Sequence, residues 1–146
     1  MTGFERSVDV QAPPAVIWRL ISRVGDWPSW TPTVTSVEAL DGLELQVGAR
    51  FELRQPKLKP AVWTVRSVTA GREFVWSKGG AGLQLTAAHS IAAASSGAAR
   101  LTISVRLSGV VAPLLWPLAG PLTRQYVTQE VESLKAAAER AACNLA

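Results

Sequence analysis

The sequence predicts an α+β protein in which a curved antiparallel sheet of six or seven strands wraps around a long C-terminal helix. Three observations predict this fold class: segments of alternating apolar and polar residues, a short amphipathic helix after the first of them, and helical apolar spacing near the C-terminus. Because the chain has 146 residues, we expect residues 1–146 to form a single domain.

The N-terminal part predicts one strand followed by two short helices. Residues 4–10 alternate, with Phe4, Val8 and Val10 on one face. Pro13 and Pro14 suit the first turn of a helix that ends near residues 25–26. The unit Trp-Pro-Ser-Trp-Thr at residues 27–31 follows, and we interpret its two indole rings as an aromatic plug of the core.

Turn residues separate the remaining expected strands, which span residues 33–40, 49–55, 61–69, 72–78, 83–92 and 100–108. A turn is expected at Gly79, Gly80 and Gly82. Alternation is clearest in residues 83–92, where one face carries Leu83, Leu85, Ala87, His89 and Ile91. These patterns predict antiparallel strands with one wet and one dry face.

The C-terminal helix is expected over residues 121–142, about twenty residues, with its apolar stripe led by Val127 and Val131. The preceding apolar segment contains Pro113 and Pro117, which predicts a loop and first helical turn over residues 109–120, covering one end of the sheet. Trp116 in this loop is either a mobile lid at the mouth of a cavity or a static cap of the core.

Composition and charge exclude several classes of protein. Apolar residues make up 48% of the chain and charged residues 18%, which is too apolar for disorder. No apolar run reaches the ~20 residues of a membrane span, and the N-terminus lacks the pattern of a signal peptide. With Cys143 as the only cysteine, these features favour the cytoplasm. The net charge of +4 comes without the aromatic interleaving of single-strand binders, so nucleic acid is not expected as a partner.

Four segments resemble the SRPBCC superfamily, which includes START-like lipid carriers, pollen-allergen-like carriers and polyketide cyclase/dehydrase-like proteins. They are APPAVIWRLISRVGDWPSWTPTVTSVE, WTVRSVTAGREFVW, AAHSIAA and SGVVAPLLWPLAGPLTRQYVTQEVESLKAAAE. The resemblance covers essentially the whole chain and implies a helix-grip fold with a hydrophobic ligand tunnel. One departure is the small residues at 90–94, where relatives often place Phe.

The candidate ligand-binding residues lie on the dry strand faces, in the segment before the last helix and on that helix. They are Phe51, Leu53, Trp63, Trp76, Leu85, His89, Leu101, Ile103, Trp116, Leu122, Tyr126, Val127 and Glu130. His89, the only histidine, is either a polar anchor or acid–base group in the cavity, or a structural residue bonded to backbone or hydroxyl. Tyr126 and Glu130, one helical turn apart, either point into the cavity or form a partly solvated shoulder.

No catalytic or metal-binding pattern is visible. A single His, a single Cys and scattered carboxylates offer no metal-ligand spacing, and no cofactor motif is found, so neither metal nor cofactor is expected. The leading hypothesis is a non-catalytic carrier or sensor of a hydrophobic small molecule such as a lipid, fatty acyl chain or polyketide-like aromatic. The alternative is a polyketide cyclase, aromatase or dehydratase in which His89 or Tyr126 donates a proton.

Overall fold

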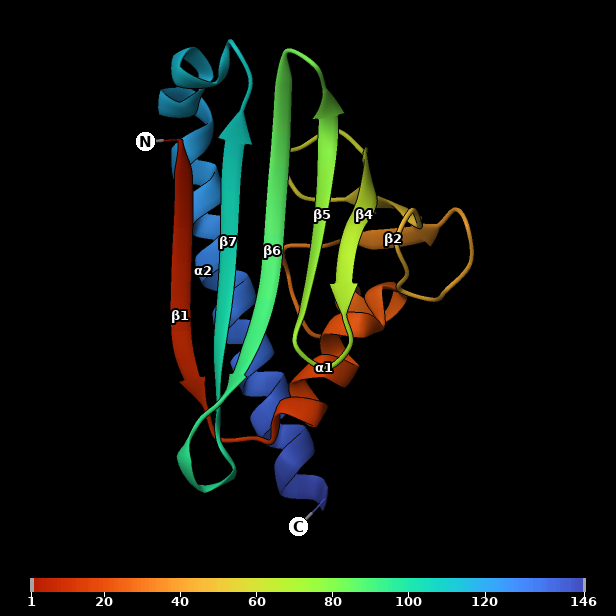
Figure 1. Ribbon diagram of the computed structural model, residues 1–146, viewed down its shortest axis with the longest axis vertical. Coiled ribbons are helices and arrows are strands. Elements are labelled where there is room, and N and C mark those ends of the chain that lie inside the picture. The colour runs from red at the N-terminus through yellow and green to blue at the C-terminus, as the bar shows by residue number, and fades with distance from the viewer. Residues whose placement is uncertain (1, 146) are drawn as a thin grey trace.

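The computed structural model of the protein describes residues 2–145, which form one sheet, two α-helices and two 3₁₀ helices (Figure 1). In chain order the elements are β1 (Gly3–Val10), α1 (Pro14–Ser22), η1 (Val24–Ser29), β2 (Ser36–Ala39), β3 (Arg50–Arg54), β4 (Ala61–Thr69), β5 (Glu73–Gly80), β6 (Leu83–Ala93), η2 (Ser95–Gly97), β7 (Ala99–Ser108) and α2 (Ala112–Leu145).

The sheet of residues 2–145 has seven strands in the order β1-β7-β6-β5-β4-β3-β2, and every neighbouring pair is antiparallel. Strands β2 to β7 follow one another along the chain. β1 pairs with β7 at the far edge, so α1 and η1 carry the chain from one edge of the sheet to the other (Figure 1). The predicted antiparallel α+β fold is confirmed, including the two short helices after the first strand.

Helix α2 lies along one face of the sheet, against β1 and β7, and also contacts α1 (Figure 1). The C-terminal half of the helix packs closely: Val131, Leu134 and Ala138 are fully buried. Ala137 and Ala138 have short side chains, which lets the helix axis approach the sheet. Burial of each larger apolar side chain contributes about 1.5–3 kcal/mol, so this half of α2 fixes the helix against the sheet.

The helix α2 is longer than the sequence predicts. Of the loop and first turn expected over residues 109–120, only residues 109–111 lie outside the helix, so this prediction is wrong from residue 112 onward. Ala112–Leu145 is helical over 34 residues, with Pro117 and Pro121 inside it. Pro113 occupies the first turn, where the missing N–H has no helical partner in any case. Each interior proline removes one backbone hydrogen bond. Packing of Ala112 and Trp116 against Leu107 offsets this loss.

Two smaller boundaries also differ from the prediction. The first helix ends at Ser22, and the Trp unit lies partly in η1 (Val24–Ser29) instead of following a longer helix. β5 extends through Gly79 and Gly80, which were expected in a turn. Gly79 has a φ of 106°, and a Cβ there would collide with the Leu83 carbonyl on β6, so a glycine permits the close pairing at this end of the hairpin.

No helix within residues 2–145 combines the length and the hydropathy that crossing a bilayer demands. The cytoplasmic location stays a prediction.

Trp116 makes the contacts that a cap of the core would make, so the cap is the alternative that a substitution can test. The ring is 9% exposed, packs with Leu107 and Ala112, and passes so close to Gly120 that a Cβ there would lie 3.1 Å from it. We therefore expect Trp116→Ala to lower the free energy of unfolding by ~3–5 kcal/mol. Leu114→Ala, two residues away and 76% exposed, is the control and should change it by less than about 0.5 kcal/mol. Urea denaturation measures both, and equal midpoints would contradict the cap.

Candidate functional site

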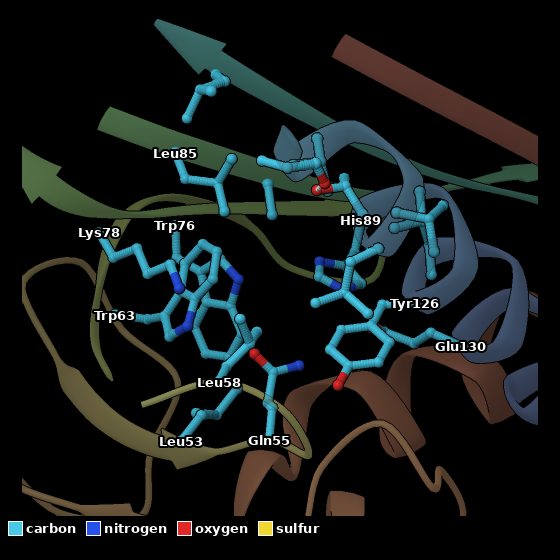
Figure 2. Close-up of a pocket in the computed structure, with 18 of the residues that line it drawn as sticks. Leu53, Gln55, Leu58, Trp63, Trp76, Lys78, Leu85, His89, Tyr126 and Glu130 are labelled. Atoms are coloured by element: carbon cyan, nitrogen blue, oxygen red, sulfur yellow. Dashed lines mark hydrogen bonds and ion pairs between the residues drawn. The ribbon is translucent and has the colours of Figure 1, made fainter. Parts of the chain in front are cut away.

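A cavity of about 440 Å³ lies between the N-terminal half of α2 and the inner face of the sheet (Figure 2). Its lining residues come from η1, from β3 and the segment after it, from β4 to β7, and from α2. They are Trp27, Leu53, Gln55, Leu58, Trp63, Trp76, Lys78, Leu85, Ala87, His89, Ile103, Val105, Leu107, Leu115, Leu118, Ala119, Leu122, Thr123, Tyr126, Val127 and Glu130.

The cavity exists because the two halves of α2 meet the sheet differently. Beyond Glu130 the helix presents Val131, Leu134 and Ala138 to the core and leaves no gap. Before Glu130 its inward residues, from Leu115 to Val127, line open space instead. Most of the lining side chains are apolar, so the cavity suits a molecule with a hydrophobic body.

Three tryptophans form an aromatic side of the cavity. Trp63 on β4 and Trp76 on β5 are stacked, with ring centroids 5.3 Å apart and planes inclined by 30°. Trp27 from η1 lies 5.1 Å from Trp76 and is fixed by its Nε1, which donates a hydrogen bond to the Ile21 carbonyl at 3.0 Å. The aromatic plug predicted from the sequence therefore also contributes one surface of the cavity.

The buried polar group of the cavity is a pair formed by His89 and Glu130. His89 Nε2 and Glu130 Oε1 are 2.7 Å apart, and the two side chains are 3% and 13% exposed. The imidazole stacks on Phe74, with centroids 4.6 Å apart and planes inclined by 4°. His89 Nδ1 is buried without a hydrogen-bond partner among the described residues. Since Glu130 accepts from Nε2 when that nitrogen is protonated, the pair can hold and release a proton inside an apolar cavity.

Tyr126 lies beside this pair, on the same face of α2 one turn earlier (Figure 2). Its ring lines the cavity, and its hydroxyl donates a hydrogen bond to the Pro56 carbonyl in the segment between β3 and β4. Burial raises the pKa of the Tyr126 phenol above its usual value. Tyr126 thus connects α2 to the segment that carries Gln55 and Leu58, which also line the cavity.

Lys78 is the only cationic residue that lines the cavity within residues 2–145. It belongs to the end of β5, and its Nζ lies 5.2 Å from the centroid of the Trp63 ring, in cation–π geometry. Burial lowers the pKa of the Lys78 ammonium below its usual value. In Figure 2 this group and the His89–Glu130 pair lie on different sides of the cavity.

The structure brings ten of the thirteen predicted site residues together around the cavity: Leu53, Trp63, Trp76, Leu85, His89, Ile103, Leu122, Tyr126, Val127 and Glu130. Phe51 and Leu101 are fully buried in the core outside the lining, and Trp116 packs at the start of α2. Their roles in binding stay predictions.

Sequence reasoning missed eleven lining residues: Trp27, Gln55, Leu58, Lys78, Ala87, Val105, Leu107, Leu115, Leu118, Ala119 and Thr123. Strand alternation already contained a signal for Lys78, Ala87, Val105 and Leu107, because each shares the face of a predicted site residue two positions away or, for Leu107, four positions away. The α2 residues from Leu115 to Ala119 were hidden by the loop expected there.

Within the residues that the structure describes, no three His, Cys, Asp or Glu side chains are grouped closely enough to hold a metal ion. The polar chemistry of the cavity therefore consists of the His89–Glu130 pair, the Lys78 ammonium and a few amide and hydroxyl groups.

The sheet, the grip of α2 and the internal cavity define a helix-grip protein of the SRPBCC superfamily. The chain belongs to the family described as polyketide cyclase / dehydrase and lipid transport, which matches residues 1–139. The resemblance noted in the sequence is thereby confirmed. No curated protein matches the chain significantly.

Solved structures share this fold at low sequence identity. An aromatase/cyclase, ZhuI, from Streptomyces sp. R1128 is 16% identical with a TM-score of 0.76, and the match covers 94% of this chain and 93% of that one. A START superfamily protein from Mycobacterium smegmatis is 15% identical with a TM-score of 0.70 and full coverage of both chains, 100% each. Ara h 8.0201 is 20% identical with a TM-score of 0.67 and 97% coverage of both. At these identities the likeness concerns the fold alone.

The contact between α2 and β6 through the His89–Glu130 pair predicts a stability effect. Glu130→Ala leaves the buried imidazole Nε2 without its partner, so we expect a loss of roughly 1–3 kcal/mol in the free energy of unfolding. Glu132→Ala on the same helix is the control. Its carboxylate is 62% exposed and forms an ion pair with Arg6 at 3.6 Å on the surface, where such a pair contributes little. It should cost less than about 1 kcal/mol. Thermal and urea denaturation at neutral pH test the difference, which would vanish if the pair contributed nothing.

Proposed function

We propose that the protein binds a hydrophobic small molecule, a lipid, a fatty acyl chain or a polyketide-like aromatic, in this cavity as a non-catalytic carrier or sensor. The observation that carries the proposal is the cavity itself. Its volume of about 440 Å³ falls in the ~300–1,000 Å³ range of small-molecule sites. An apolar lining with a few polar groups is also typical of such sites, where the polar groups orient the ligand.

Membership of the polyketide cyclase / dehydrase and lipid transport family supports the proposal, because both activities in that description use hydrophobic molecules. The stacked Trp63 and Trp76 rings offer a flat surface of the kind that aromatic or acyl ligands cover. Native mass spectrometry of freshly purified protein tests the proposal directly. A mass increment that disappears on denaturation identifies a bound small molecule and its class.

A matched pair of alanines gives a second test. Ala87 on β6 lines the cavity, whereas Ala88, the next residue, faces the other side of the sheet. We expect Ala87→Leu to occupy part of the cavity and weaken binding of the neutral fluorescent probe N-phenylnaphthylamine by at least about tenfold, ~1.4 kcal/mol.

Ala88→Leu is the control and should leave the affinity for the probe unchanged. Fluorescence titration measures both variants, and circular dichroism checks that each one folds. Equal affinities in the two variants would place the probe outside the cavity and argue against the proposal.

The second candidate function is a polyketide cyclase, aromatase or dehydratase, and the His89–Glu130 pair favours it. An imidazole in contact with a carboxylate inside an apolar cavity is a suitable general acid–base group for moving a proton at a bound carbonyl. His89 is the better donor of the two residues considered from the sequence, because the Tyr126 hydroxyl already donates to the Pro56 carbonyl.

The His89→Gln variant discriminates between the two functions. Glutamine retains a hydrogen-bond donor for Glu130 but carries no titratable proton. For a carrier we expect the parent protein to show no turnover of a poly-β-ketone substrate and the variant to keep its affinity for N-phenylnaphthylamine. Cyclised or dehydrated product made by the parent and lost in the variant, with probe binding intact, would instead assign an enzyme.

A further inference from the structure

Lys78 stands apart from the other charged residues of the sheet because it faces inward. Phe74, Trp76 and Lys78 alternate along β5 and share one face, on which Phe74 and Trp76 are buried. The Lys78 side chain accordingly lines the cavity, and its ammonium lies 5.2 Å from the centroid of the Trp63 ring. A strongly hydrated ammonium is disfavoured in an apolar setting unless a partner compensates for the lost water.

The protein supplies only part of that compensation. The ion pairs found among residues 2–145 do not include Lys78, and no carboxylate of these residues lies within 4.0 Å of its Nζ. The Trp63 ring attracts the cation but cannot neutralise it. Lowering of the Lys78 pKa by burial is in keeping with an incompletely compensated cation. An anionic group on a ligand would complete the compensation.

The Lys78 ammonium and the His89–Glu130 pair lie at two separate positions along the strands. In the β5–β6 register His89 pairs with Phe74, and Leu85 pairs with Lys78. Lys78 therefore lies four residues after the position on β5 that is opposite His89. At ~3.3 Å per residue this separation is about 13 Å along the strand. Glu130 lies with His89 (Figure 2), so the oxygen atoms of a carboxylate stand at that position, whereas a cation that attracts an anion stands at the one beside Lys78.

We propose that Lys78 and Trp63 form a subsite for the anionic oxygen group of an otherwise hydrophobic ligand. The ligand is then a hydrophobic acid, with its apolar body along Trp76 and the lining residues of α2. Its far end lies near Glu130, which accepts a hydrogen bond from a hydroxyl or phenol there. This assignment rests on the proposed binding function and adds to it the chemical class and the orientation of the ligand.

A matched pair of probes tests the subsite. N-phenylnaphthylamine is neutral, and anilinonaphthalene sulfonate is the same ring system carrying one anionic sulfonate. We expect the wild-type protein to bind the sulfonate at least about tenfold more tightly, because only the sulfonate can form a charge-assisted hydrogen bond with the Lys78 ammonium. Lys78→Met, which keeps the length and apolar character of the stem, should abolish this preference while leaving the affinity for N-phenylnaphthylamine unchanged.

Two further variants control the measurement. Lys78→Arg retains the charge and should retain the preference for the sulfonate. Arg72→Met removes one positive charge from the exposed turn between β4 and β5, outside the cavity lining, and should have no effect on either probe. Loss of the preference in Arg72→Met would assign the preference to net charge and overturn the subsite. Equal binding of both probes by the wild-type protein would also overturn it, and so would a Lys78→Met variant that keeps the wild-type preference.

Failure of the subsite is distinguishable from failure of the proposed function. If wild type binds N-phenylnaphthylamine but shows no preference for the sulfonate, the subsite is wrong and hydrophobic binding stands. If neither probe binds, the proposed function fails as well.

Where the sulfonate probe does bind, its displacement distinguishes the source of the acid. Displacement by dodecanoate indicates a fatty acid, and displacement by naphthoate indicates an aromatic acid. Displacement by dodecanol as effective as by dodecanoate would overturn the subsite.

Discussion

The approach of α2 to the sheet is the constraint on which the rest of the structure depends. Close packing of Val131, Leu134 and Ala138 fixes the C-terminal half of the helix, and the helix cannot bend freely to fill the space beside its other half. At its other end Ala112 and Trp116 pack with Leu107, so α2 is held at both ends. The cavity is what remains between these two contacts, and it is maintained without any side chain having to occupy it.

The polar contacts of the cavity reinforce this arrangement at its middle. His89 and Glu130 join β6 to α2 where close packing gives way to open space. A hydrogen-bonded pair of this kind costs desolvation, and replacement by apolar residues often leaves stability unchanged. Stability alone is therefore a weak reason for its presence. Its position on the surface of the cavity gives a better one, because a ligand meets these polar atoms in a setting with little competing water.

The sequence predicted the strands and their inward faces well because strand alternation is a local property. Ala61–Thr69 was predicted to the residue, and inward residues such as Trp63 and Trp76 followed from parity. The start of α2 was missed because prolines disfavour a helix locally. The packing of Trp116 on α2 against Leu107 on β7 favours the helix, but a contact between two elements leaves no local pattern in the sequence. The His89–Glu130 contact was beyond prediction for the same reason: it depends on how α2 is rotated and shifted against β6.

Lys78 illustrates how a correct rule can be applied too narrowly. Its parity with Trp76 placed it inward, yet a lysine near the end of a strand is ordinarily assigned to solvent, since its long stem lets the ammonium reach water. In the structure the stem is partly buried and the ammonium lies over Trp63. A carrier needs its ligand held in one orientation without reaction, and the proposed subsite at Lys78, separated along the strands from the His89–Glu130 pair, would supply that orientation. A catalyst also needs a proton donor at the reacting atom. The same cavity places His89 at the end opposite Lys78, so the position of the ligand's carbonyl relative to these two groups is what separates the two functions.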